Sequence, residues 1–198
     1  MRQHRRTVCW FGKLPCVGDF CSGNMSEPLI DALDSWLSVT MQSGEEKHGA
    51  AWTNAYYQAP MHGFLFGNKT LPALGGQSAV GVMMPSVDKA GRAFPFILME
   101  HLDQSETALP SKDALTRWFL QAHTLCASAL DEEWTLVQFS QALGLLPELQ
   151  LEHPSATEGD DTHWYRIEFS GAVQWLTRYR GLPDIRAFET LFGLGAAP

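Results

Sequence analysis

The chain has 198 residues, a length that fits one domain able to bury a hydrophobic core without disulfides or a structural metal. Hydrophobic residues make up 45% of the sequence, and 22 acidic against 14 basic residues give a formal net charge of −8. This acidic balance argues against nonspecific nucleic-acid binding and against docking on an anionic membrane, because both need clustered cations.

The first predicted elements are a strand, a loop and an amphipathic helix. Residues 7–14 alternate loosely and are rich in β-branched and aromatic types, which favours a strand. Residues 15–24 carry the glycines and the proline of a loop. Ser26, followed by an acid and a proline, is typical of a helix start. Apolar residues then recur at helical spacing, and we expect Gly44 and the polar stretch 45–48 to end this helix.

Three strands are predicted next. Residues 55–67 are rich in aromatic side chains and are interrupted by a proline and a glycine, so we expect a strand with an irregular middle. Residues 79–84 and 92–101 flank a short turn and are expected to pair antiparallel. Pro95 cannot donate a backbone hydrogen bond, so its strand should lie at a sheet edge or contain a bulge.

The rest of the chain predicts mostly helices, with one strand and one mobile loop. Because the strand connections are tight, the predicted fold is α/β of the α+β type, with a mostly antiparallel central sheet flanked by helices. The longest predicted helix begins at Ser111, and a shorter helix begins at Thr135. A mobile polar loop at 151–162 and a final strand at 164–169 follow. Two further helices are predicted, one from Ser170 that carries Val173, Leu176 and Tyr179, and a last one at 183–192.

No catalytic or metal-binding motif is complete. Residues 63–70 approach a phosphate-binding loop and residues 76–81 approach a nucleophile elbow, but each departs from its pattern. The histidines and the four cysteines match no metal-ligand spacing, while Cys16 and Cys21 leave a redox role open. The basic start leads into no signal peptide, and no apolar run could span a membrane. We therefore expect a soluble protein of the reducing cytoplasm.

Two polar segments, 11–20 and 81–96, stand out from this background. They are open to a structural interpretation, in which Ser86 and Asp88 bond local amides, Gly91 takes a positive φ and Arg92 pairs with Asp88 or Asp19. They are also open to interpretation as a rigid recognition edge or as an enzymatic site. The candidate site residues are Lys13, Gly18, Asp19, Ser86, Asp88, Lys89, Gly91 and Arg92.

In this order, the two segments resemble the TagF/ImpM family of type VI secretion-associated proteins. The family pattern is Gly-Lys-Leu-Pro and Gly-Asp-Phe near the N-terminus, followed later by Pro-Ser-Val-Asp-x-x-Gly-Arg-x-Phe-Pro. The resemblance is best over residues 8–130 of a single TagF-like domain, 1–198, in which residues 131–198 are expected to form a helical C-terminal part. The matching positions are 12–15, 18–20, 85–88, 91–92 and 94–95.

The resemblance implies an accessory protein of the bacterial type VI secretion system, a posttranslational negative regulator that binds a forkhead-associated scaffold protein. It implies no cofactor and no catalytic activity, and a fold related to longin or SNARE-like domains. Two alternatives stay open: a structural component of the secretion apparatus, and a small hydrolase that uses Ser86, Asp88 and Lys89. The hydrolase requires a base within hydrogen-bond reach of the Ser86 hydroxyl.

Overall fold

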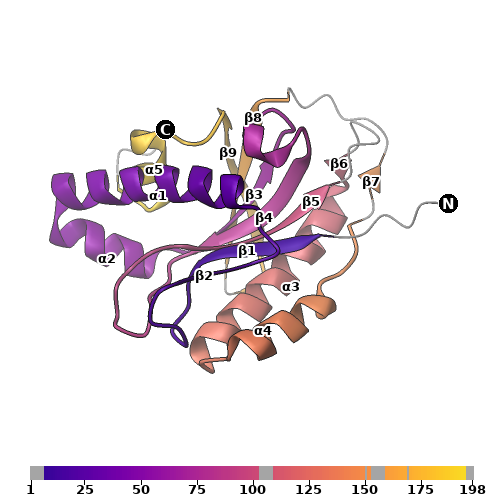
Figure 1. Cartoon of the computed structure of the whole chain (residues 1–198). Helices are drawn as coiled ribbons and strands as arrows, with labels where there is room; N and C mark the ends of the chain where they lie inside the picture. Colours follow the sequence, from indigo (N-terminus) through magenta and orange to yellow (C-terminus); the bar gives the residue numbers. More distant parts are fainter. Residues whose placement is uncertain (1–6, 103–108, 150, 153–158, 169, 195–198) are drawn as a thin grey trace.

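A seven-stranded sheet forms the centre of the computed structural model, which describes residues 7–102, 109–149, 151–152, 159–168 and 170–194. The strand order is β2-β1-β5-β4-β3-β8-β9, so β2 and β9 are the two edges (Figure 1). Every neighbouring pair runs antiparallel. The strands are β1 (Val8–Lys13), β2 (Phe20–Gly23), β3 (Met61–Phe66), β4 (Ser78–Met84), β5 (Phe96–Leu102), β8 (Asp161–Ile167) and β9 (Val173–Arg180).

Helices cover both faces of the sheet, which gives three layers (Figure 1). One face carries α1 (Glu27–His48), α2 (Ala50–Gln58) and α5 (Ile185–Leu191), and the other carries α3 (Lys112–Asp131) and α4 (Leu136–Ala142). The predicted α+β fold, an antiparallel sheet flanked by helices, is thus confirmed. Smaller elements are 3-10 turns at Pro72–Leu74 and Leu143–Leu145 and a two-stranded sheet of β6 (Leu109–Pro110) and β7 (Leu151–Glu152).

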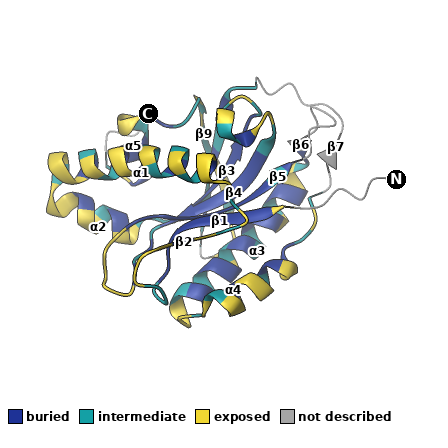
Figure 2. Ribbon diagram, viewed as in Figure 1, coloured by how far each residue is buried: buried dark blue, intermediate teal, exposed yellow. Residues whose placement is uncertain are grey.

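The two covered faces explain the long apolar runs of the central strands. On β5, Phe96 and Leu98 belong to the core beneath α3 and α4, while Ile97 and Met99 belong to the core beneath α1 and α2. Successive side chains on a strand point to opposite faces, so a strand covered on both faces needs apolar residues at nearly every position. Figure 2 shows the buried strands between helices whose outward sides are exposed.

Two helix starts predicted from capping residues, at Ser111 and Thr135, are confirmed, whereas Ser26 precedes a helix but its side chain makes no capping hydrogen bond. Ser111 accepts a hydrogen bond from the Ala114 amide, and Thr135 forms a capping box with Gln138. These side-chain oxygens satisfy amides that have no partner within the first helical turn. The last predicted helix is α5, which Asp184 caps. The longest helix, however, is α1 with 22 residues rather than α3 with 20.

Helix α1 continues through Gly44 and the polar stretch 45–48, which were predicted to end it. The helix runs to His48, and Gly49 then begins the turn into α2. Gly44 is buried, and a Cβ atom built there would lie 2.5 Å from the ring of Trp52. The missing side chain therefore lets α2 pack closely on α1, and it does not end the helix.

The predicted strand at 55–67 is wrong in its first part, which belongs to α2. Trp52 and Tyr56 lie one helical turn apart, and both are buried. Burial of this face outweighs the strand preference of aromatic residues. Pro60 follows the helix, and the strand itself begins only at Met61.

Two further predictions about strands are corrected near the N-terminal edge. The predicted loop 15–24 contains the edge strand β2, which pairs with β1 over four residue pairs. Pro95 was expected to mark an edge or a bulge, but β5 is an inner strand between β1 and β4. Because Pro95 precedes the first residue of β5, the ladder needs no hydrogen bond from it.

The helix predicted from Ser170 is instead the edge strand β9. Its signal was the three-residue spacing of Val173, Leu176 and Tyr179, of which only Leu176 and Tyr179 pack on the layer with α1, while Val173 packs on the opposite face. A register shift opposite Trp164 and Tyr165 leaves Leu176 without a partner on β8. Such a bulge lets residues three apart face the same side of a strand, so the spacing imitates a helix.

The C-terminal part, 131–198, is therefore not the helical region that we expected. It contains α4 and α5, but also β8 and β9, which complete the central sheet beside β3. The strand predicted at 164–169 is β8, which begins at Asp161 and is followed by another strand. Of the predicted mobile loop 151–162, residues 153–158 lie outside the described part of the chain.

One buried histidine is expected to make stability depend on pH. His62 on β3 is fully buried, and within the described residues neither ring nitrogen forms a hydrogen bond of normal geometry. Burial, reinforced by the positive charge of Arg166 on β8, lowers the pKa of His62 from 6.5 to about 4. Below pH 6.5 the unfolded chain therefore binds a proton that the folded chain does not bind until about pH 4.

We expect His62 to lower the free energy of unfolding by of order 3 kcal/mol as the pH falls from 7 to 4. Urea unfolding across this range should show the loss in the wild-type chain and a flatter dependence in His62→Leu. Equal slopes for the two proteins would contradict this account of His62.

Candidate functional site

The two polar segments meet at one end of the sheet. The loop between β1 and β2 lies beside the loop between β4 and β5 (Figure 1). The Lys89 amide donates to the Val17 carbonyl at 2.8 Å, and Arg92 Nη2 donates to the Gly18 carbonyl at 2.8 Å. We call the surface formed by residues 16–20 and 87–94 the motif edge.

The buried carboxylate of Asp88 holds the β4–β5 turn of the motif edge in place. The side chain of Asp88 is 0% exposed, and its Oδ1 accepts hydrogen bonds from the amides of Ala90 and Arg92, both at 2.9 Å. Its Oδ2 lies 2.7 Å from Arg92 Nε and 3.3 Å from Lys13 Nζ. Burial alone raises the pKa of Asp88, but the Arg92 amide and then the Lys13 and Arg92 side chains outweigh burial and lower the pKa to about 2. Asp88 is therefore an ionised structural group that fixes the β4–β5 turn.

Lys13 balances this carboxylate from inside the molecule. Its side chain is almost buried, and its Nζ also donates to the Arg92 carbonyl at 3.4 Å. The ammonium group lies 5.1 Å from the ring centroid of Phe20, a favourable cation–π position. Phe20 in turn stacks on Phe11 and contacts Phe94 edge to face, yet it remains 43% exposed. The charged cluster thus supports an aromatic side chain at the surface.

Ser86 ties three elements together through backbone hydrogen bonds. Its hydroxyl donates to the Lys13 carbonyl at 2.6 Å, at the end of β1. The hydroxyl of Tyr56 on α2 accepts from the Ser86 amide and donates to the Ser86 carbonyl, both at 2.9 Å. The Phe94 amide also donates to the Ser86 carbonyl, at 3.0 Å. Ser86 is buried and belongs to the frame of the motif edge.

This arrangement does not assemble the hydrolase considered above. The Ser86 hydroxyl is bonded to a backbone oxygen rather than to a general base. The Asp88 carboxylate is engaged by Lys13 and Arg92, and Lys89 is exposed on the turn. Ser86, Asp88 and Lys89 are therefore close in sequence but are not arranged as nucleophile and base.

Replacing Tyr56 by phenylalanine is expected to lower the free energy of unfolding by about 1–3 kcal/mol, because the Ser86 amide and carbonyl would lose a buried partner. Urea denaturation measures this change directly. Tyr57→Phe is the matched control, since the neighbouring tyrosine is 54% exposed, and it should change stability by less than about 0.5 kcal/mol. Equal losses in the two variants would contradict the bridging role of Tyr56.

The eight predicted site residues thus divide into two groups. Lys13, Ser86 and Asp88 are buried and build the frame, whereas the other five are exposed. Gly91 has φ of 78°, as the structural interpretation predicted, and Arg92 pairs with Asp88 rather than with Asp19. Sequence reasoning missed Phe20, Phe94 and Tyr56. The exposed predicted residues are Gly18, Asp19, Lys89, Gly91 and Arg92.

A groove of about 550 Å³ opens beside the motif edge, between α1, α2 and the β4–β5 loop. We call it the motif groove. The groove thus lies between the second polar segment, 81–96, and the helices α1 and α2. Residues that line it include Gln42 and Glu45 from α1, Thr53 and Tyr57 from α2, and Arg92 and Phe94 from the loop.

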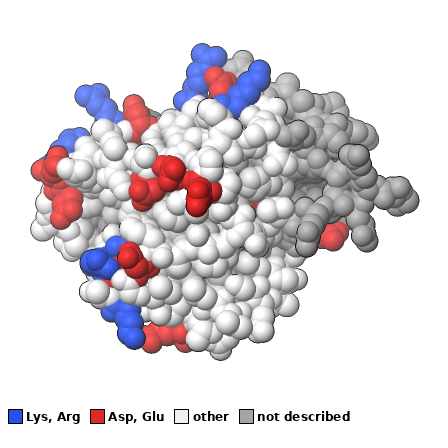
Figure 3. Space-filling view, viewed as in Figure 1, with Lys and Arg blue, Asp and Glu red and all other residues white. Residues whose placement is uncertain are grey.

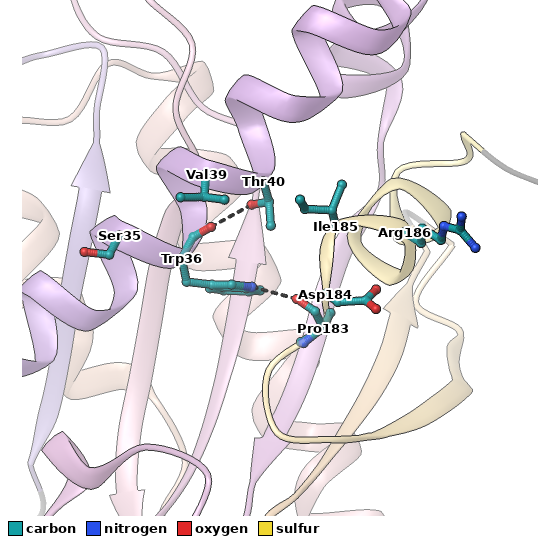
Figure 4. Close-up of a pocket in the computed structure, with 8 residues that line it drawn as sticks. All are labelled: Ser35, Trp36, Val39, Thr40, Pro183, Asp184, Ile185 and Arg186. Atoms are coloured by element: carbon teal, nitrogen blue, oxygen red, sulfur yellow. Dashed lines mark hydrogen bonds between the residues drawn. The ribbon is translucent and has the colours of Figure 1, made fainter.

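A second groove, of about 530 Å³, lies between α1 and the start of α5 (Figure 4). Trp36 donates from its indole nitrogen to the Pro183 carbonyl at 2.8 Å and closes one side. Val39 and Ile185 are exposed beside it. This groove is mainly apolar and lies outside both motif segments.

The described residues give no basis for two further kinds of site, one for a metal ion and one for a membrane. Within them, no group of three or more His, Cys, Asp and Glu side chains is placed to hold a metal ion. In the same part of the chain, no helix combines the length and the apolar character needed to cross a membrane. The motif edge and the motif groove are therefore the best candidate functional surface.

Comparison with known proteins gives a family and a solved structure. The family model described as the TagF N-terminal domain, type VI secretion system-associated, matches residues 9–146, which includes both polar segments and α4. The chain is also similar to the crystal structure of PA0076 from Pseudomonas aeruginosa PAO1. That likeness has a TM-score of 0.76 and 27% sequence identity, and it covers 96% of each chain. No curated protein matches the chain significantly.

Proposed function

Because the chain belongs to the TagF N-terminal domain family and is a type VI secretion accessory protein, we propose that it is a posttranslational negative regulator of such a system. It acts in the cytoplasm by binding a forkhead-associated scaffold protein through the motif edge. In this proposal the exposed residues of the motif edge contact the partner, and the buried residues form the frame that holds them.

The observation that carries the proposal is the way Arg92 is held. Its guanidinium is bonded from behind by Asp88 and by the Gly18 carbonyl, yet the side chain is 60% exposed. Phe20 and Lys89 are exposed on the same edge. Arginine and aromatic residues are enriched at protein interfaces, and groups fixed before binding lose little entropy when a partner docks. This arrangement supports a protein-binding surface better than a catalytic one.

The proposal is tested by affinity purification of the tagged chain from a host that carries the secretion system, followed by mass spectrometry. We expect the forkhead-associated scaffold to co-purify and deletion of the chain's gene to increase secretion. Stable recovery of sheath or baseplate proteins without the scaffold would point instead to a structural component of the apparatus. Secretion that is unchanged by the deletion would contradict the regulatory role.

A further inference from the structure

The motif groove presents Arg92 in a fixed orientation. Its Nε donates to Asp88 Oδ2 at 2.7 Å and its Nη2 donates to the Gly18 carbonyl at 2.8 Å. A guanidinium has five N–H groups, so three lie outside these two bonds. The side chain is 60% exposed and lines the groove. When a carboxylate binds this guanidinium, the side chain therefore loses little conformational entropy, because it is already ordered.

The charges around the groove select where an anion can lie. Asp88 neutralises only one of its two cationic partners, Lys13 and Arg92, so these three residues keep one net positive charge. Glu45 lines the opposite wall on α1 and repels a carboxylate there. In Figure 3, blue atoms with red beside them gather at the lower left, over the end of the sheet where the two loops lie in Figure 1. An acidic group therefore fits at the loop side of the groove.

The same groove offers apolar surface next to Arg92. Tyr57 lines the groove from α2 and is 54% exposed, whereas Phe94 lines it beside Arg92 with only 6% of its surface exposed. Aromatic side chains of this kind contribute large contact areas at low entropic cost. The groove therefore combines one fixed cation with an aromatic wall.

We propose that the motif groove binds a protein segment in which a carboxylate stands next to an apolar side chain. The carboxylate lies on Arg92, and the apolar side chain packs against Tyr57 and Phe94. This inference rests on the proposed regulatory binding and deepens it, because it names the surface that binds and the chemistry of the bound segment.

The test measures binding of the purified forkhead-associated scaffold from the same secretion system by isothermal titration calorimetry. Thr53, exposed on α2, lines the groove and can be changed without touching the frame. Thr53→Glu should weaken binding about tenfold by repelling the carboxylate, whereas Thr53→Lys should bind at least as tightly as the wild type. Arg92→Lys should also weaken binding about tenfold, because an ammonium group cannot reproduce the guanidinium fork. Thr124→Glu, at an exposed threonine on α3, is the control and should bind normally.

Each outcome decides between the claims. Wild-type affinity in both Thr53→Glu and Arg92→Lys would show that the scaffold binds the chain outside the motif groove, and would overturn the groove proposal. Equal weakening by Thr53→Glu and Thr53→Lys would overturn the acidic character of the segment. No binding by the wild-type chain would remove the proposed scaffold partnership, and the groove proposal with it. Melting temperatures of all variants separate lost binding from lost folding.

Discussion

Asp88→Asn is expected to lower the melting temperature by about 5–10 °C, because it leaves a buried lysine without its counterion. An asparagine oxygen can still accept the amides of Ala90 and Arg92. Its NH₂ group, however, would take the place of Oδ2 and face the N–H donors of Lys13 and Arg92, so these donors would lose their acceptor. The turn should loosen, and Arg92 should lose its fixed orientation. Thermal unfolding followed by circular dichroism measures the shift.

Asp19→Asn is the matched control for this substitution. Asp19 lies on the neighbouring loop, is exposed, and its Oδ1 accepts from the next amide, Phe20. An asparagine oxygen can replace that contact, so the melting temperature should change by less than about 2 °C. A similar loss in both variants would show that the buried ion cluster is not what sets the effect.

The acid dependence of the Asp88 effect has a definite sign. The folded pKa of about 2 lies below the ordinary 3.8, so the stabilisation by Asp88 is complete above about pH 4. It is lost as the pH falls from about 4 towards 2. The difference in melting temperature between the wild type and Asp88→Asn should therefore shrink over that window.

Gly12→Ala is the second substitution with a large expected effect, and it should prevent folding or lower the free energy of unfolding by about 3–5 kcal/mol. Gly12 has φ of 136°, a conformation that residues with side chains rarely adopt. A Cβ atom there would lie 2.3 Å from the Pro95 carbonyl oxygen, which belongs to the backbone and cannot rotate away. The methyl group would push β1 from β5 beside the frame of the motif edge.

Gly18→Ala belongs to the same sequence motif and provides the control. A Cβ atom at Gly18 would meet no atom within 4 Å, and the carbonyl that accepts from Arg92 is kept. Stability should change by less than about 1 kcal/mol, as measured by urea unfolding. Normal folding of Gly12→Ala, or an equal loss in Gly18→Ala, would contradict the steric reason given for Gly12.

Elements with local signals could be predicted from the sequence. Ser111 and Thr135 are capping residues, and the strands β4 and β5 are apolar runs around one turn, so neighbours in the chain determine them. Elements that depend on distant packing were mispredicted. The glycine at 44 imitated a helix end because its partner Trp52 is known only once α2 is placed.

The sequence indicated which segments form the candidate site, but not which of their residues are buried and which are exposed. The two motif segments that the sequence singled out do meet, through hydrogen bonds from Arg92 and the Lys89 amide. Which residues are buried depends on contacts across the sheet, so Lys13 looked like a contact residue until Asp88 was placed beside it. Tyr56 carried no signal at all, because its partner Ser86 lies 30 residues away in the sequence.

Hydrogen–deuterium exchange of the full chain, with and without the forkhead-associated scaffold, tests the central claim most directly. That claim is that a buried ionic frame holds the motif edge and the motif groove ready for a protein partner. We predict slower exchange on binding in residues 16–20, 53–57 and 88–94, with α3 and α4 unchanged. Protection confined to α3 and α4, or unchanged exchange at the motif edge in a complex that has formed, would contradict it.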